Sequence, residues 1–371
     1  MVPSDAAVGL ALLALGGLVF GVAVWLTGQL VTARAAFAYL DHPNERSLHS
    51  APTPRGGGLA IVGGVALGVA LGLAADALLG WPHLTPFAAA SVGPGVWVLG
   101  MALLIAAVSF WDDRVGLAPG PRFAVHALAA CGVVLGAGLA VRAVPLPGVG
   151  TLPLGGLAAP LTIVALVWMA NLYNFMDGMD GFAGGMAVLG FGFLALLAAT
   201  GGHRFIALVA WLTASAAGGF LVFNVPPARI FLGDVGSVFL GFLAGALAVM
   251  GVNDGLFDPW VPLLIFSPFI LDATTTLLRR LVRGERVWQA HREHYYQRLV
   301  LAGWTHRKTV LAEYALMLAC GLSAVVYRHA SDAARLAILA TWAVVYVALA
   351  LAVTLVERRA SLTRVNSLGT R

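Results

Sequence analysis

Long apolar runs separated by short polar segments occupy almost the whole chain. A helix needs roughly 20 apolar residues to cross the hydrocarbon core of a bilayer, and run after run reaches that length. The pattern predicts eleven spans. They cover about 6–32, 57–80, 92–111, 123–141, 156–175, 182–200, 205–223, 236–253, 259–278, 309–327 and 334–356. We therefore expect an all-α polytopic membrane protein.

Composition agrees with this pattern, because 60% of the residues are hydrophobic and 11% are charged. A soluble domain has about 25% charged residues. The first span lacks a basic segment and a cleavage site, so we expect it to be retained. Cys131 and Cys320 fall inside apolar spans and indicate neither a disulfide framework nor a thiolate metal site. No repeat or linker divides the chain, so residues 1–371 are treated as one domain.

The basic residues predict the orientation. Four of the 22 Lys and Arg residues fall on the same side as the N-terminus: Arg142, Arg204, Arg328 and Arg335. Because basic residues concentrate on the cytoplasmic side, the N-terminus is expected outside and the C-terminus in the cytoplasm. The net charge of +5 then reports topology and does not indicate a nucleic-acid partner.

This topology places the acidic and histidine-rich motifs on one face. They fall in cytoplasmic loops at about 33–56, 112–122, 176–181, 224–235 and 279–308. Polar motifs with independent structural roles would be distributed over both faces. We therefore expect these loops to form one cytoplasmic site.

The second loop contains two adjacent carboxylates, Asp112 and Asp113. Their mutual repulsion raises one pKa unless a cation neutralises it. Such a pair suits a general base or the neighbourhood of Mg²⁺. The alternative is a solvated helix end neutralised by Arg114.

The third loop follows a run in which Asn171, Asn174, Asp177 and Asp180 recur every three residues. Ionisable groups are costly at membrane depth, and carboxylate and carboxamide oxygens suit a hard cation. Each step of three drifts about 60° around a continuous helix, so the set covers about half the circumference. Either the helix breaks near Gly178 or some of the four face elsewhere. Helix capping is the alternative.

In the fourth loop Asp234 stands between Gly233 and Gly236, just before a new span. These glycines would let phosphate oxygens approach the backbone, and a helix N-terminus favours anions. A capping aspartate is the alternative, but nearby Asn224 and Arg229 make the loop more specific.

In the last loop His291 and His294 share a helix face with Arg298. The spacing does not match a zinc site. The arginines suggest contacts to pyrophosphate or a nucleotide, with binding of anionic lipid as the alternative. Asp272 lies deep enough in its span to need a partner such as Arg279.

Taken in order, the motifs PTPRGGG, WDDRVGL, NFMDGMDG, FNVPPARIFLGDVGS and AHREHYYQRL resemble the polyprenyl-phosphate N-acetylhexosamine-1-phosphate transferases (glycosyltransferase family 4). The resemblance covers roughly residues 40–300. It implies an enzyme of the bacterial inner membrane with a cytoplasmic site for Mg²⁺ or Mn²⁺. Such enzymes transfer a sugar 1-phosphate from a UDP-N-acetyl sugar to undecaprenyl phosphate and release UMP.

The resemblance also implies roles for individual residues. Asp112 and Asp113 match the catalytic aspartate pair, and Asp234 with Asn174 matches the metal site. Residues expected to bind the nucleotide sugar and phosphates are Asp177, Asp180, Asn171, Asn224, Arg229, His291, His294, Arg55 and Arg122. Which aspartate acts, and whether as base or nucleophile, stays open.

Two departures bear on the substrate. Arg122 stands where many members have lysine, and the last loop reads HREH in place of a triple-histidine run. The second departure disfavours UDP-MurNAc-pentapeptide and favours the O-antigen-type branch. That branch uses UDP-GlcNAc or a 6-deoxy relative such as UDP-FucNAc or UDP-QuiNAc. A groove between helices is expected for the prenyl chain.

The sequence also allows two rival functions. A transporter of nucleotide-sugars or ions would place its polar groups near the bilayer midplane, commonly in paired repeats. A scaffold binding lipid headgroups would not need acidic and histidine loops on one side. The sequence leaves open whether the protein forms a homodimer.

Overall fold

The computed structural model describes residues 5–32, 39–41, 52–79, 92–286 and 291–369. The apolar runs form helices because a chain in hydrocarbon must satisfy its own backbone hydrogen bonds. The first half contains α1 (Asp5–Thr32), β1 (Tyr39–Asp41), β2 (Thr53–Arg55), α2 (Gly58–Leu79), α3 (Val92–Val115), α4 (Pro119–Cys131), η2 (Gly132–Gly136), β3 (Ala143–Leu146), β4 (Gly150–Pro153) and η3 (Gly155–Leu157). The second half contains α5 (Ala158–Phe175), α6 (Phe182–Thr200), α7 (Arg204–Asn224), α8 (Gly233–Asn253), α9 (Trp260–Val282), α10 (Tyr295–Leu301), α11 (His306–His329) and α12 (Asp332–Gly369).

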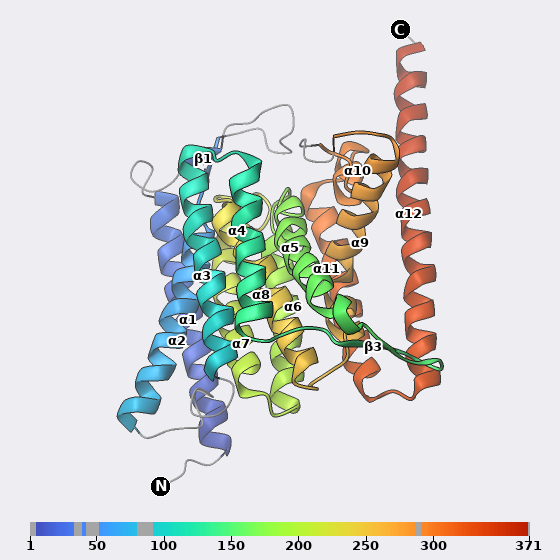
Figure 1. The fold of residues 1–371 in the computed structure, drawn as a ribbon. Coiled ribbons are helices and arrows are strands. Elements are labelled where there is room, and N and C mark those ends of the chain that lie inside the picture. The colour runs from blue at the N-terminus through green and yellow to red at the C-terminus, as the bar shows by residue number, and fades with distance from the viewer. Residues whose placement is uncertain (1–4, 33–38, 42–51, 80–91, 287–290, 370–371) are drawn as a thin grey trace.

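The all-α polytopic prediction is confirmed, with one correction to the number of continuous spans. Among the described residues, ten helices are long and apolar enough to cross a membrane, against eleven expected. The difference lies at 123–141, where the 13-residue α4 continues into the π-helical segment η2. Helix α1 begins at the lower end of the bundle and α12 ends at the upper end (Figure 1). This arrangement needs an odd number of passes, and α4 with η2 supplies the eleventh.

Close packing against α3 accompanies the change in helix type at η2. A Cβ atom on Gly132 would lie 2.6 Å from Sδ of Met101, and one on Gly136 would lie 2.8 Å from the Trp97 ring. The two glycines therefore let the backbone lie against large side chains of α3. Apolar patterning predicted the span but gave no sign of this break.

Helix α8 forms the centre of the bundle. It is buried along 89% of its most apolar stretch and packs against α2, α3 and α5. Its N-terminus lies at the same end as the C-termini of α3 and α5, the upper end in Figure 1. Among the described residues, Arg55 and the segment 112–122 therefore lie beside the start of α8.

The glycine run of PTPRGGG fixes α2 against α8. Backbone amides of 56–58 donate to the carbonyls of Phe231 and Leu232 over 2.8–3.2 Å. A Cβ atom on Gly58 would lie 2.2 Å from the backbone nitrogen of Gly236. Gly236 therefore serves close packing between helices, a reason different from the phosphate approach expected from the sequence.

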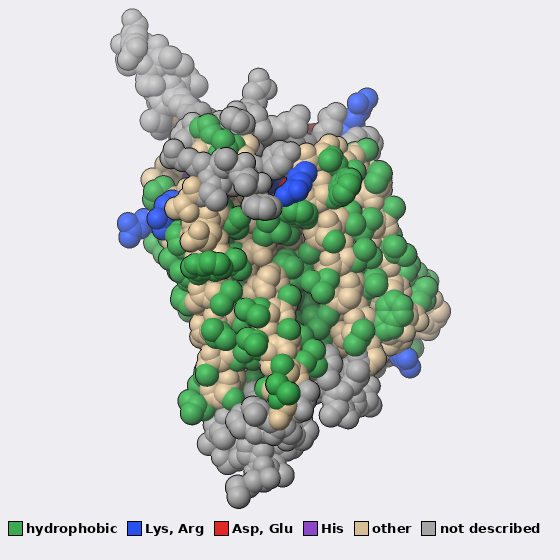
Figure 2. Space-filling model, turned by 90° about the vertical axis from the view of Figure 1, so that its left-hand side faces the viewer, with side chains coloured by type: hydrophobic (Ala, Val, Ile, Leu, Met, Phe, Trp, Pro, Cys, Tyr) green, Lys and Arg blue, Asp and Glu red, His purple; other side chains and the backbone are tan. Residues whose placement is uncertain are grey.

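The far end and the outer flank differ from this polar end. Strands β3 and β4 form an antiparallel hairpin at the lower end, with Ala143 opposite Pro153. Helix α12 lies at the outer edge of the bundle, buries 6% of its most apolar stretch and contacts α9 through a hydrogen bond between Tyr346 and Ser267. The flank seen in Figure 2 is covered by hydrophobic side chains, with Lys and Arg near its two ends. This is the surface that a bilayer would cover.

Gly58→Ala tests the contact between α2 and α8. The added methyl group meets backbone atoms, so we expect the free energy of unfolding to fall by about 1–3 kcal/mol. The melting temperature of the purified protein in detergent measures the effect. Gly21→Ala is the control, since a Cβ there meets nothing within 4 Å. Equal melting temperatures for Gly58→Ala and the unsubstituted protein would contradict the packing role.

Candidate active site

Four aspartates and two arginines gather at the upper end of the bundle. Asp112 and Asp113 end α3, and Asp234 lies in the first turn of α8. Arg55 ends β2 and Arg122 lies in the first turn of α4. The fourth aspartate, Asp177, lies in the loop after α5.

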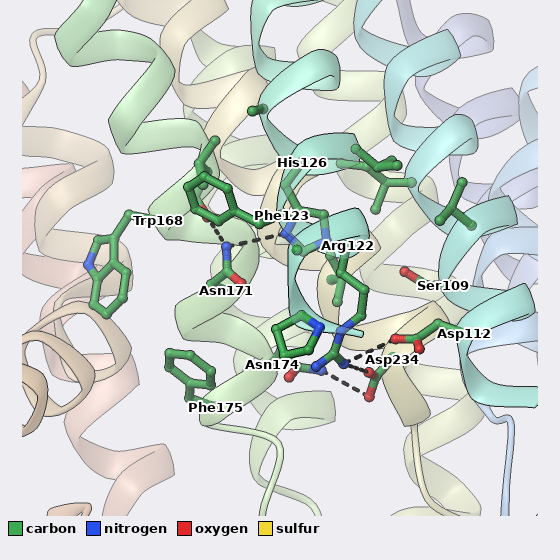
Figure 3. A pocket seen from close by; sticks show the side chains of 18 of the residues that line it. Ser109, Asp112, Arg122, Phe123, His126, Trp168, Asn171, Asn174, Phe175 and Asp234 are labelled. Carbon is green, nitrogen blue, oxygen red and sulfur yellow. Dashed lines mark hydrogen bonds and ion pairs between the residues drawn. The ribbon is translucent and has the colours of Figure 1, made fainter. Parts of the chain in front are cut away.

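Asp234 is the centre of this cluster, because both guanidinium groups contact it. Arg55 donates to Oδ1 of Asp234 and also lies 3.5 Å from Asp113. Nη1 of Arg122 lies 3.3 Å from Oδ2 of Asp234 and 3.0 Å from Oδ2 of Asp112. Figure 3 shows Arg122 between the two carboxylates. The arginines thus link three carboxylates that would otherwise repel one another.

Asn174 also holds Asp234, through the oxygen that Arg55 contacts. Its Nδ2 donates to Oδ1 of Asp234 over 3.1 Å and to Oγ of Ser237 over 2.9 Å. Ser237 is fully buried one turn along α8. The N-cap of α8 is Leu232, and Asp234 in the first turn accepts from three side chains. The capping alternative for Asp234 is therefore not what the structure shows.

The two adjacent aspartates have different surroundings. Asp112 accepts from the backbone N–H of Leu117 over 2.7 Å and faces Arg122. Asp113 accepts from the backbone N–H of Val235 over 3.3 Å and so stabilises the first turn of α8. Neither is a freely solvated helix end paired with Arg114 alone, the alternative reading of the sequence.

Asp177 adds negative charge beside this cluster. Burial raises the pKa of its carboxyl from 3.8 to about 7, an effect that the positive charge of Arg55 opposes. The carboxylates of Asp234 and Asp113 raise the pKa further. The neighbouring carboxylates therefore disfavour a further negative charge on Asp177, and an added cation would relieve this repulsion.

A cavity of about 770 Å³ opens beside the cluster. Asp112, Arg122, Asn174 and Asp234 line its polar end. Its remaining wall is mainly apolar and comes from α3, α4 and α5, with Phe123, Trp168 and Phe175 visible in Figure 3. The sequence-based expectation of a groove between helices matches this shape.

The cavity also contains a polar pair that our sequence analysis missed in part. His126 is buried in α4, and its Nδ1 lies 3.2 Å from Nδ2 of Asn171. Asn171 therefore lies in the wall of the groove, away from the Arg55 side of the cluster. A lone histidine inside an apolar run was the signal that could have identified His126, because such residues are costly in hydrocarbon.

Two residues expected at the nucleotide instead join the loops to each other. Asn224 is buried, accepts from Gly181 N–H over 3.0 Å and donates to the carbonyl of Ile230. Asp180 accepts from Ala228 N–H over 3.1 Å and lies 3.3 Å from Nδ1 of His306. These bonds join the loop after α5 to the loop after α7 and to the start of α11. A nucleotide contact by either residue stays a prediction.

The histidine motif is fixed to α9. Nδ1 of His294 lies 3.1 Å from Oδ1 of Asp272, so the partner of Asp272 is His294 and not the expected Arg279. The ring of His291 lies 4.9 Å from that of His294, and burial lowers its pKa from 6.5 to about 4. His291 is therefore neutral at physiological pH.

Arg229 has a different contact. Its guanidinium lies 4.6 Å from the centre of the Phe223 ring, on the loop between α7 and α8. Roles for Arg229 and for the two histidines at the nucleotide remain predictions.

The donor groups of the cluster are oxygen atoms of carboxylates and a carboxamide. Within the described part of the chain, no three His, Cys, Asp or Glu side chains are arranged to hold a metal ion. The oxygen chemistry of Asp113, Asp177 and Asp234 nevertheless suits a hard cation. Arg55 contacts two of these carboxylates, Asp113 and Asp234, in this structure.

Fold and cluster together define a polytopic membrane protein with a charged site at the end of an apolar groove. A family model described as glycosyl transferase family 4 matches residues 96–252. A Bacillus subtilis protein named probable undecaprenyl-phosphate N-acetylglucosaminyl 1-phosphate transferase is 30% identical over 295 residues, covering 79% of this chain and 78% of that protein. The decaprenyl-phosphate N-acetylglucosaminephosphotransferase of Mycolicibacterium smegmatis is 32% identical, with 84% and 81% covered.

A further relative shares a shorter region. The phospho-N-acetylmuramoyl-pentapeptide-transferase of a Synechococcus strain is 36% identical over 180 residues, or 46% of this chain and 50% of that protein. The chain belongs to glycosyl transferase family 4, and the family resemblance inferred from its motifs is confirmed.

The raised pKa of Asp177 predicts a pH-dependent stability. A carboxyl with a pKa near 7 in the folded state and 3.8 when unfolded binds protons more tightly when folded, so stability falls as pH rises from about 4 to 7. Asp177→Asn removes this titration. With EDTA present, we expect the variant to melt on the order of 3 °C above the unsubstituted protein at pH 8 and close to it at pH 4. A melting difference that is constant with pH would contradict the assignment.

Proposed function

We propose that this protein transfers N-acetylhexosamine 1-phosphate from a UDP-sugar to a polyprenyl phosphate, giving a polyprenyl diphospho-sugar and UMP. The observation that carries the proposal is the charged cluster at the end of an apolar groove. An amphiphilic acceptor with a phosphate head and a hydrocarbon tail matches that combination. Family membership and the names of the relatives support the same reaction.

The groove suits the prenyl end of the acceptor. Its α5 wall extends from Phe175 to Ile163, and 12 helical steps cover about 18 Å. Val164 and Phe123 line it and are 63% and 59% exposed, so the groove opens on the lipid-facing flank. A phosphate at its polar end would meet Arg122, with Asp112 beside it.

For the donor we propose UDP-GlcNAc, with a 6-deoxy relative such as UDP-FucNAc or UDP-QuiNAc as the alternative. Two relatives that match most of this chain are named for N-acetylglucosamine. The relatives named for the muramoyl-pentapeptide match less than half of it. The product would be the first lipid intermediate of a surface polysaccharide of the O-antigen type.

We further propose that Mg²⁺, or Mn²⁺ in its place, binds at Asp234 with Asp113 and Asp177 nearby. The support is electrostatic, since four carboxylates face two guanidinium groups. Asn174 would orient Asp234, to which it donates. When bound, the ion supplies charge neutralisation for the diphosphate.

The chain's own residues account for the remaining steps of the mechanism. Arg122 orients the acceptor phosphate, and an oxygen of that phosphate attacks the β-phosphorus of the UDP-sugar. The new P–O bond forms as the bond from the β-phosphorus to the bridging oxygen breaks, and UMP leaves with that oxygen. Asp112 lines the groove and Asp113 does not, so Asp112 is the proposed base for an acceptor proton.

The site faces the cytoplasm in this proposal. The bundle end that holds the cluster is also the end where α12 finishes. The topology expected from the sequence assigns 18 of the 22 Lys and Arg residues to this side. Water-soluble UDP-sugar is made in the cytoplasm, so the orientation from the positive-inside rule suits the donor. The membrane is then the bacterial inner membrane.

A direct assay tests the reaction. Purified protein, undecaprenyl phosphate and Mg²⁺ are mixed with a panel of UDP-N-acetyl sugars, and UMP release is followed. We expect turnover with UDP-GlcNAc or a 6-deoxy relative, and a loss on the order of 100-fold or more in Asp234→Ala. Asp332→Ala is the control, because Asp332 is exposed at the opposite end. The absence of UMP with every sugar would refute the enzyme function.

Filling the groove tests where the acceptor binds. In Val164→Trp, a ring replaces an exposed side chain of the groove wall, so KM for polyprenyl phosphate should rise roughly fivefold, about 1 kcal/mol of lost binding. KM for the UDP-sugar should stay within twofold. Val344→Trp is the matched control on the exposed face of α12. Equal acceptor KM values in the two variants would place the prenyl chain elsewhere.

A further inference from the structure

Helix α12 is the least embedded of the ten candidate spans in the described residues. Its 38 residues extend about 57 Å, well beyond a bilayer core of about 30 Å, so its last part rises past the membrane on the side of the site. A cleft of about 700 Å³ lies between α12 and the short helix α10. Apolar packing therefore does little to fix the upper part of α12 to the bundle.

One ion pair bridges this cleft. Nε of Arg298 on α10 donates to Oε1 of Glu357 on α12 over 2.8 Å, and Nη2 donates to Oε2 over 2.5 Å. Nη2 also lies 3.3 Å from Oγ1 of Thr354. The Arg298 side chain is 13% exposed and lies 5.0 Å from the centre of the Tyr295 ring. A two-point bond of this kind fixes orientation as well as distance.

The N-terminus of α10 is fixed to α9 by a single carboxylate. Asp272 accepts from His294 and from the backbone N–H groups of Tyr295 and Tyr296. Because α10 has seven residues, this contact and the Arg298 pair hold both of its turns.

The other face of α10 supports the loop that contains Asp177. Tyr296 is fully buried, with its ring 4.7 Å from that of Phe182 at the start of α6. Its hydroxyl donates to the carbonyl of Phe175 over 3.5 Å. A Cβ atom on Gly178 would lie 2.2 Å from this hydroxyl, so Tyr296 fills the space directly against the loop. Any shift of α10 is therefore transmitted to the residues flanking Asp177.

We propose that Arg298 and Glu357 are positioning residues through which α12 holds α10, and through α10 the Asp177 loop, in the active arrangement. The kinetic part rests on the proposed transferase function. The pair does not touch the groove or the four-aspartate cluster, so its effect is indirect. An exposed ion pair usually contributes little. Here the Arg298 side chain is 13% exposed and binds Glu357 at two points, a geometry in which an ion pair contributes more.

Charge reversal tests the pair in the full-length protein in lipid nanodiscs. Arg298→Glu and Glu357→Arg should each lower kcat/KM for the UDP-sugar about tenfold, since small misplacements of active-site groups are costly. KM for polyprenyl phosphate should stay within twofold because the groove lies on α3, α4 and α5. The double variant Arg298→Glu/Glu357→Arg should return to within twofold of the starting kcat/KM. Arg358→Glu is the matched control, an exposed neighbour on the same cleft.

Hydrogen–deuterium exchange of the amides of 295–301 provides a readout independent of activity. Exchange should quicken in both single variants and recover in the double variant. If the protein lacks transferase activity, this measurement still tests the bridge while the proposed function fails. Unchanged exchange, faster exchange with unchanged kcat/KM, or a double variant as impaired as the singles would each overturn the proposal.

Discussion

The bonds from Arg55 and Arg122 to Asp234 are the interaction on which the rest of this structure depends. Four carboxylates in a largely apolar bundle repel one another strongly, and two guanidinium groups make their assembly tolerable. Each arginine is positioned by a different structural element. The backbone hydrogen bonds from 56–58 to the residues before α8 fix Arg55 beside the start of that helix. Arg122 is positioned by the first turn of α4. The contacts that pack the helices therefore also determine the electrostatics of the site.

Sequence patterning predicted the spans and the gathering of polar loops because both follow from the cost of placing charge in hydrocarbon. The family resemblance assigned Asn174 and Asp234 to one metal site; in the structure Nδ2 of Asn174 donates to Oδ1 of Asp234 over 3.1 Å, and the metal role stays a prediction. The break between α4 and η2 was not predictable, since it depends on contacts of Gly132 and Gly136 with α3. An apolar run looks the same whether its helix is continuous or not.

Partners of individual polar groups were the least predictable part of the site. Asp180 resembled a nucleotide ligand in the sequence, and in the structure it accepts from Ala228 and faces His306. Side-chain type showed that Asp272 needed a partner, but the choice of His294 over Arg279 depends on how α10 folds back. Glu357 lies beyond the last recognisable motif, 59 residues from Arg298, so nothing local marked it.

Because the groove opens sideways, the concentration that matters for a molecule entering it is its concentration within the membrane. Val164 and Phe123 line the groove on the outer flank, so a molecule can enter it from within the plane of the bilayer. Encounter then becomes two-dimensional diffusion, and the relevant quantity is the mole fraction of that molecule among the membrane lipids. Diluting the vesicles in buffer would leave this quantity unchanged, whereas adding inert phospholipid would lower it. Membrane composition thus acts as a control on occupancy of the groove.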